Sequence, residues 1–276
     1  MGMVSYLNGT FIDTGNLTIS PYDLGLLRGY AVFDIMRTHN GKPFLFSGHW
    51  KRLYNSAKQF GLKLPVSEKE FAAVLKTLLR LNGFRESMIK TVVTGGPSAD
   101  GFSPAGKETF FIIIEDLKTL PQDVYLLGAK VITLEHPREC PSVKSTNYMT
   151  AMKHSRERMK RGAIEILYTC GGKALEGSVS NLFIVKRGGL ITPKEGILLG
   201  ITRNFVIKLA RKLKLQIEER AIPIKELLKA DEAFMTSSTR NIVPVVMVDR
   251  TRIGPGKVGP VTKAILDAAE RYNESY

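Results

Sequence analysis

The chain has few of the features that mark membrane-spanning or disulfide-bonded proteins. Its 276 residues contain no apolar run of about 18 residues, which a transmembrane helix needs. The N-terminus lacks the charged segment followed by an apolar one that a secretory signal requires. Only two cysteines are present, Cys140 and Cys170, too few for a disulfide framework. We therefore expect a reduced, cytoplasmic protein.

Metal-binding and serine-nucleophile motifs are also absent. The four histidines, at positions 39, 49, 136 and 154, form no H-x-x-x-H pair, and no Cys-x-x-Cys occurs, so we expect no metal site. A G-x-S-x-G elbow is missing as well. Two glycine-rich segments, 101–107 and 254–259, match phosphate-binding patterns only in their letters. Neither has the strand-to-helix setting that phosphate binding requires.

Positive charge is what the chain has in excess. The formal net charge is +14, spread along the whole length. Its densest cluster, 153–162, has no interleaved aromatic residues and is typical of a solvated helix face. This charge suits small anions such as phosphates and carboxylates, and we expect no nucleic-acid or membrane partner. A basic nucleic-acid-binding protein stays as an alternative of another class.

Helical and strand patterns are interspersed in both halves, which predicts an α/β (α+β) fold with two lobes. We place a small N-terminal α/β lobe at 1–117, a linker at 118–128 and a larger C-terminal lobe at 129–276. Ser67 and Glu70 form a capping-box pattern at the start of one expected helix. Helices are expected near 49–60, 67–81, 148–161, 201–213 and 261–272.

Several polar motifs are dispersed along the chain in a fixed order. They are Arg37, His49-x-x-Arg52, Lys144-Ser145-Thr146-Asn147-Tyr148, Glu176-Gly177-Ser178-Val179-Ser180-Asn181-Leu182-Phe183, Thr192-Pro193, Leu199-Gly200-Ile201-Thr202-Arg203 and Met235-Thr236-Ser237-Ser238-Thr239. Their order and spacing resemble the class IV (fold-type IV) aminotransferases over nearly the whole chain. That family includes branched-chain and D-amino acid aminotransferases and 4-amino-4-deoxychorismate lyases, and the resemblance implies pyridoxal 5′-phosphate as the cofactor.

The resemblance assigns roles to the residues that would hold this cofactor. Lys144 resembles the catalytic lysine that binds it as a Schiff base, and its amine must be neutral to attack carbonyl carbon. Glu176 resembles the carboxylate that keeps the pyridine nitrogen protonated. Arg52 shares a helix face with His49 and resembles the arginine that grips the phosphate. The remaining cofactor-binding candidates are Tyr148 for the phenolic oxygen, Leu199 for the ring face, and Ile201, Thr202, Ser238 and Thr239 for the phosphate.

The substrate pocket departs from each known branch of the family. Branched-chain enzymes typically carry tyrosine and arginine where this chain has Arg28 and Lys90. D-amino acid enzymes carry an Arg-x-His trap in a loop that here contains neither residue. We take Arg28 as the candidate carboxylate anchor. Other substrate-binding candidates are Phe33, Arg37, Lys90 and Ser180.

The leading hypothesis is transamination between an α-amino acid and an α-keto acid, with D-amino acids slightly preferred because of the short chain and the KSxN-type motif at Lys144. A branched-chain L-amino acid aminotransferase and an aminodeoxychorismate lyase are the alternatives, and a cofactor-binding protein without turnover is an alternative of another class. Small amino and keto acids are the expected partners. The resemblance also implies a homodimer.

Overall fold

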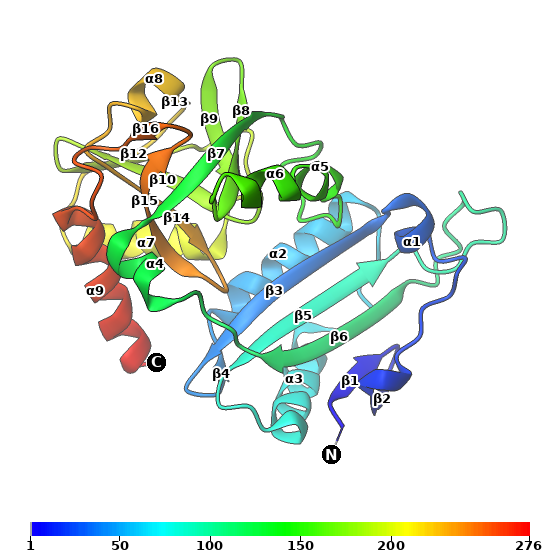
Figure 1. Cartoon of the computed structure of the whole chain (residues 1–276). Helices are drawn as coiled ribbons and strands as arrows, with labels where there is room; N and C mark the ends of the chain where they lie inside the picture. The colour runs from blue at the N-terminus through cyan, green and yellow to red at the C-terminus, as the bar shows by residue number, and fades with distance from the viewer. Residues whose placement is uncertain (1) are drawn as a thin grey trace. The chain divides into compact units, whose positions relative to one another are not determined.

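The computed structural model describes residues 2–276 and divides them into two compact units (Figure 1). Unit 1 comprises the residues up to Lys118, the segment Val143–Asn147 and Tyr276. Unit 2 comprises Thr119–Ser142 and Tyr148–Ser275. The sequence boundaries placed all of 129–276 in one lobe, whereas here the segment that contains Lys144 belongs with unit 1.

Unit 1 is built on a six-stranded antiparallel sheet in the order β2-β1-β6-β5-β3-β4. Along β3, Val32 and Met36 are buried while Phe33 and Arg37 are half-buried, so the strand presents two different faces. The strands are β1 (Val4–Leu7), β2 (Thr10–Asp13), β3 (Ala31–His39), β4 (Lys42–Pro43), β5 (Ser87–Thr94) and β6 (Thr109–Asp116).

Two long helices, α2 (Phe46–Gln59) and α3 (Glu68–Asn82), form one core with the buried face of this sheet. Ser67 caps α3 in the predicted capping box, and Gly83 ends the helix in the left-handed conformation. Thus the local signals located α3 correctly, whereas α2 begins three residues before the expected start at His49. Unit 1 also has the short helices η1 (Thr14–Asn16) and α1 (Leu24–Arg28).

The segment Val143–Asn147 joins unit 1 by pairing with the first half of β3. The Phe33 N–H donates to the Lys144 carbonyl at 2.9 Å, and the Thr146 N–H donates to the Ala31 carbonyl at 3.2 Å. The Lys144 N–H donates to Ser56 Oγ of α2 at 3.1 Å. These bonds fix the Lys144 backbone on both sides, and they explain why a residue so late in the chain belongs to the first unit.

Unit 2 is built on a mixed ten-stranded sheet in the order β12-β11-β10-β14-β15-β7-β8-β9-β13, with β16 on β15. An additional pairing of β9 with β10 closes six of these strands into a ring, β9-β10-β14-β15-β7-β8. The strands are β7 (Ala129–Glu135), β8 (Glu165–Cys170), β9 (Lys173–Gly177), β10 (Asn181–Lys186), β11 (Gly189–Thr192), β12 (Ile217–Glu219), β13 (Ile222–Pro223), β14 (Glu232–Ser237), β15 (Asn241–Val248) and β16 (Thr251–Arg252).

Unit 2 differs from the expected layout in three details. The segment 118–128 contains a helix, α4, and the helix expected over 148–161 is two short helices that meet at His154. The strand β9 was not anticipated. The long helices α7 and α9 confirm the predictions over 201–213 and 261–272. The helices are α4 (Gln122–Leu127), α5 (Met149–Lys153), α6 (Ser155–Lys160), α7 (Ile201–Lys212), α8 (Ile224–Leu227) and α9 (Pro260–Glu274).

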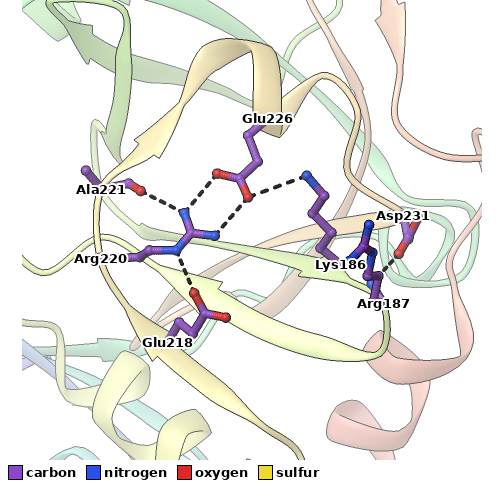
Figure 2. Close-up of polar contacts among 7 residues, drawn as sticks. All are labelled: Lys186, Arg187, Glu218, Arg220, Ala221, Glu226 and Asp231. Atoms are coloured by element: carbon purple, nitrogen blue, oxygen red, sulfur yellow. Dashed lines mark hydrogen bonds and ion pairs between the residues drawn. The ribbon is translucent and has the colours of Figure 1, made fainter.

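A surface network of ion pairs fastens α8 to the neighbouring strands (Figure 2). The Arg220 guanidinium binds Glu226 through two bonds of 2.8 Å and Glu218 through one of 2.6 Å. Lys186 of β10 approaches Glu226 at 3.6 Å. The hydrogen bonds from Arg220 lower the pKa of Glu226. Because these groups are close to solvent, the network contributes little to stability and is a structural feature of the surface.

Membrane-spanning and metal-binding features are both missing from the described part of the chain. Throughout residues 2–276, no helix is both long and apolar enough to cross a membrane. In the same residues, no cluster of three or more metal-binding side chains occurs.

Candidate active site

Lys144 is held above an aromatic ring in unit 1. Its Nζ lies 4.5 Å from the centroid of the Phe33 ring, and the backbone bonds between the two residues keep them adjacent. Both side chains are half-buried. The structure therefore brings together two residues that the sequence singled out for separate reasons, one as the catalytic lysine and the other as a wall of the substrate pocket.

Elsewhere in unit 1, β3 turns a carboxylate toward α2. Asp34 accepts from Arg52 Nε at 2.7 Å and from Arg52 Nη2 at 3.0 Å, and its Oδ1 lies 2.6 Å from His49 Nδ1. Burial alone would raise the pKa of Asp34, but Arg52 and His49 outweigh it and hold this pKa well below its ordinary value. Burial lowers the pKa of His49. The predicted phosphate-binding Arg52 is thus oriented by a carboxylate.

The face of the unit 1 sheet opposite α2 and α3 carries other candidate substrate-binding residues. Phe33 and Arg37 lie on this face, and Lys90 joins them because it is paired with Ile35 across β3 and β5. Lys90 is bound to Glu115 at 2.7 Å. Arg28 lies elsewhere, at the end of α1, where its guanidinium stacks 4.4 Å from the centroid of the Phe102 ring.

Glu176 lies on β9 of unit 2, where the ring of strands closes, and is buried. Arg138 Nε donates to its Oε1 at 2.7 Å, and the Leu198 N–H donates to its Oε2 at 3.0 Å. Asn181, its partner across β9 and β10, donates to Oε2 at 3.4 Å. Without these partners a buried carboxylate would be costly, so this set of donors compensates the burial of Glu176.

Tyr148 shares the electrostatic environment of Glu176. Burial, opposed by Arg138 and reinforced by the charge of Glu176, raises the pKa of Tyr148 to about 12. The phenol is therefore a neutral hydroxyl that can donate to an anionic oxygen. Arg138 was not anticipated, because nothing in the loop that carries it forms a recognisable motif.

Helix α7 presents an uncapped N-terminus. Its N-cap is Gly200, which has no side chain to accept the first N–H groups, those of Ile201 and Thr202 among them. A Cβ on Gly200 would lie 2.1 Å from Asn181 Oδ1, so any other residue here would force the buried Asn181 side chain to move. Leu199, just before the helix, is half exposed to solvent (50%) despite being apolar.

This donor set fits a phosphate attached to an aromatic ring. The helix N-terminus and the Thr202 hydroxyl suit the phosphate, and an exposed leucine suits the face of the ring. Ser238 and Thr239, in the turn after β14, are half-buried and supply two further hydroxyls. On β14 itself, the buried Thr236 Oγ1 has no hydrogen-bond partner within residues 2–276.

A second buried carboxylate, Glu165 of β8, lies in the same unit. The Val179 N–H and the Ser180 hydroxyl donate to its Oε1 at 2.7 and 2.9 Å, and Arg240 Nη1 lies 3.2 Å from its Oε2. Burial raises the pKa of Glu165. Ser180, which the sequence suggested for substrate binding, is itself buried and bound to this carboxylate.

Comparison with known proteins identifies the family. Residues 31–248 match the family described as amino-transferase class IV, and this match covers more than half of the chain. The chain therefore belongs to the class IV aminotransferases. The sequence-based prediction of this family, of its enzyme class and of pyridoxal 5′-phosphate as its cofactor is confirmed.

Relatives of known description fall into the three branches that the sequence suggested. The chain is 36% identical over 272 residues to a "Putative branched-chain-amino-acid aminotransferase" of Methanocaldococcus jannaschii, covering 96% of this chain and 94% of the relative. It is 31% identical to an aminodeoxychorismate lyase of Bacillus subtilis, covering 94% and 91%. It is 29% identical to a D-alanine aminotransferase of Staphylococcus aureus, covering 98% of both.

Solved structures agree on the fold. The branched-chain amino acid aminotransferase of Escherichia coli superposes with a TM-score of 0.92 at 27% identity, covering 98% of this chain and 94% of that one. The branched-chain enzyme of the archaeon Thermoproteus uzoniensis, solved with norvaline, gives 0.91 at 27% identity, covering 99% and 95%. A third branched-chain enzyme, solved with pyridoxamine 5′-phosphate, gives 0.92 at 27% identity, covering 100% and 96%. The predicted two-lobed fold-type IV class is confirmed.

Proposed function

We propose that this enzyme transfers the amino group of an α-amino acid with an apolar side chain to an α-keto acid, with branched-chain L-amino acids as the first candidate donors. The observation that carries this proposal is the position of the Lys144 amine above Phe33, next to Ile35 and Val92 on the sheet face that also carries Arg37 and Lys90. The apolar part of this surface favours an aliphatic side chain. The 36% identity to the relative from Methanocaldococcus jannaschii supports the same choice.

D-amino acids, which the sequence alone placed first, become the second candidate. They are supported by the D-alanine aminotransferases, which match this chain over 98% of its length. The loop 95–108 contains no Arg-x-His pair to hold their carboxylate, and this places them behind the branched-chain substrates.

Two residues act on the reacting atoms and on the cofactor ring. When bound, the cofactor supplies an electron sink for the carbanion at the substrate α-carbon. Lys144 would bind the cofactor covalently, and its amine, once freed, would take the proton from the substrate α-carbon and deliver it to C4′ of the cofactor. Glu176, held by Arg138, accepts from the pyridinium N–H.

The other groups hold and orient. We assign the phosphate to Arg52, to the N–H groups of Ile201 and Thr202, and to the hydroxyls of Thr202, Ser238 and Thr239. Tyr148 donates to the phenolic oxygen, and Leu199 packs against the ring. Family resemblance further supports a cytoplasmic homodimer that acts on small amino and keto acids.

A half-reaction screen tests the proposal. The holoprotein is mixed in turn with L-leucine, L-glutamate, D-alanine and D-glutamate, and the visible absorption of the cofactor is followed. We expect L-leucine to bleach it, and the Lys144→Ala variant to show no change with any substrate. Bleaching by the D-amino acids alone would reverse the order of the two candidates. A protein that shows no visible band, and to which borohydride attaches no cofactor, would refute the aminotransferase proposal altogether.

A further inference from the structure

Arg240 occupies the turn between β14 and β15, directly after the two hydroxyl residues assigned to the phosphate. We propose that Arg240 binds the α-carboxylate of the amino acid substrate, through the part of its guanidinium that Glu165 leaves available. This inference rests on the proposed function, because it takes an α-amino acid as the substrate.

The residue is fixed at both backbone and side chain. Its carbonyl accepts from the Tyr125 hydroxyl at 3.0 Å, and its N–H donates to Ser237 Oγ at 3.4 Å. At the other end, Nη1 lies 3.2 Å from Glu165 Oε2. A guanidinium held in this way loses little freedom on binding a ligand, which is the condition for a selective carboxylate site.

The guanidinium retains unused donors. It has five N–H groups, and the contact with Glu165 engages only Nη1. For Nε and Nη2, the structure of residues 2–276 shows no other partner. The side chain is 31% exposed, so a ligand can reach it. A planar fork with two adjacent nitrogens matches the two oxygens of a carboxylate.

Glu165 occupies only part of the hydrogen-bonding capacity of Arg240. Glu165 is only 2% exposed and already accepts from the Val179 N–H and the Ser180 hydroxyl. Burial raises the pKa of Glu165 even with Arg240 alongside. Because a guanidinium stays protonated in proteins, the nitrogens that Glu165 does not contact can still offer their N–H groups to an anion.

Arg240 also lies at the cofactor-binding end of unit 2. The charge of Glu165 contributes to the raised pKa of Tyr148, as does that of Glu176. Glu165 and its arginine are thus within electrostatic reach of the phenol assigned to the cofactor. Two of the other candidates for substrate binding already have partners, since Lys90 is bound to Glu115 and Arg28 stacks on Phe102.

The test measures binding rather than turnover. Holoprotein is titrated by calorimetry with 4-methylvalerate, which keeps the carboxylate of a branched-chain substrate but lacks its amino group, and with the neutral 4-methylvaleramide. We expect Arg240→Met to weaken carboxylate binding about tenfold or more and to leave amide binding unchanged. Arg250→Met, at the turn after β15, removes the same charge elsewhere and should change neither affinity.

Other outcomes would overturn the proposal. These are an unchanged affinity of Arg240→Met for 4-methylvalerate, an equal loss for both compounds, or wild-type protein that does not distinguish them. If Arg240→Met does not fold, Arg240→Lys gives the same test, because it keeps the charge but loses the fork and should weaken carboxylate binding several-fold. Bleaching of the wild-type cofactor by L-leucine stands independently of these results, so failure of the anchor and failure of the proposed function are distinguishable.

Discussion

Each unit buries a carboxylate beside an arginine, but the two carboxylates respond in opposite ways. In unit 1, Asp34 has Arg52 in a two-pronged contact and His49 Nδ1 at 2.6 Å, and its pKa falls. In unit 2, Glu165 has Arg240 at the longer distance of 3.2 Å, and its pKa rises. The two-pronged contact with Arg52 thus helps to overcome desolvation at Asp34, whereas the single contact with Arg240 does not overcome it at Glu165.

The difference matches the roles that we assign to the two arginines. Arg52 is committed to Asp34 through two of its nitrogens, so this carboxylate fixes the direction of the side chain. Arg240 contacts Glu165 through one nitrogen only, and we propose that the others bind a ligand. An arginine that binds a ligand can therefore be oriented by a buried carboxylate through either a two-pronged or a single contact.

The largest expected effect comes from removing the reactive amine of unit 1. Lys144→Ala should lower the rate of transamination by about 10³-fold or more, because no neighbouring group can replace a covalent nucleophile. The rate is measured with saturating donor and acceptor, and Lys153→Ala on α5 serves as the control. Activity within about tenfold of wild type would exclude Lys144 as the covalent residue.

Removing Asp34 from its pair with Arg52 in unit 1 should lower the free energy of unfolding the most. In Asp34→Ala, the buried His49 and Arg52 lose their shared partner, and we expect the free energy of unfolding to fall by about 3–5 kcal/mol. Urea denaturation measures this change, with Asp116→Ala at the exposed end of β6 as the control. A loss below about 1 kcal/mol would show that the pair is not a tightly coupled one.

Lowering the pH should reveal the contribution of the Asp34–Arg52 pair to stability. Folded Asp34 binds its proton less tightly than the unfolded chain does, so unfolding takes up a proton as the pH falls below its ordinary value of 3.8. Its contribution is therefore present above that pH and is lost below it. Wild type should lose this contribution on acidification, and Asp34→Ala should lack that part of the decline. Parallel curves for the two proteins would contradict the lowered pKa.

The smallest effect on stability is expected at Glu165 in unit 2, and its dependence on pH runs in the opposite direction to that of Asp34. Because the pKa of Glu165 is raised, its contribution is fully present below its ordinary value of 4.5 and is lost as the pH rises through the folded-state pKa. Glu165→Gln should change stability by only about 1 kcal/mol and should flatten this decline. Thermal unfolding at a series of pH values measures it. A wild-type contribution of Glu165 that grows as the pH rises through this range would contradict its raised pKa.

Local signals in the sequence located some elements and could not locate others. Ser67, Glu70 and Gly83 are within one segment, and they define α3 without help from the rest of the fold. The strand β9 is short and follows two glycines, and it is stabilised by partners that come from both sides of the ring. Such a strand depends on pairing that is distant along the chain.

The candidate site shows the same division. The order and spacing of the sequence motifs singled out Lys144, Glu176 and Arg52, because each lies in a motif that resembles one of the family's. Their supporting partners, Arg138 and Asp34, carry no local signature and were found only where the folded chain brings them to 2.7 Å from Glu176 and Arg52. Substrate preference depends on such partners, which is why it stayed open in the sequence.

The closed ring of unit 2 has a consequence for how that unit opens. Glu176 and Asn181 form the pairing that joins β9 to β10, so the carboxylate assigned to the pyridine nitrogen stands where the ring closes. Any fluctuation that separates β9 from β10 would displace Glu176 as well. Cofactor binding should therefore protect the amide hydrogens of β9 and β10 from exchange with deuterium more than those of the outlying β12. Exchange at the β9–β10 pairing would then report how much of the protein holds cofactor.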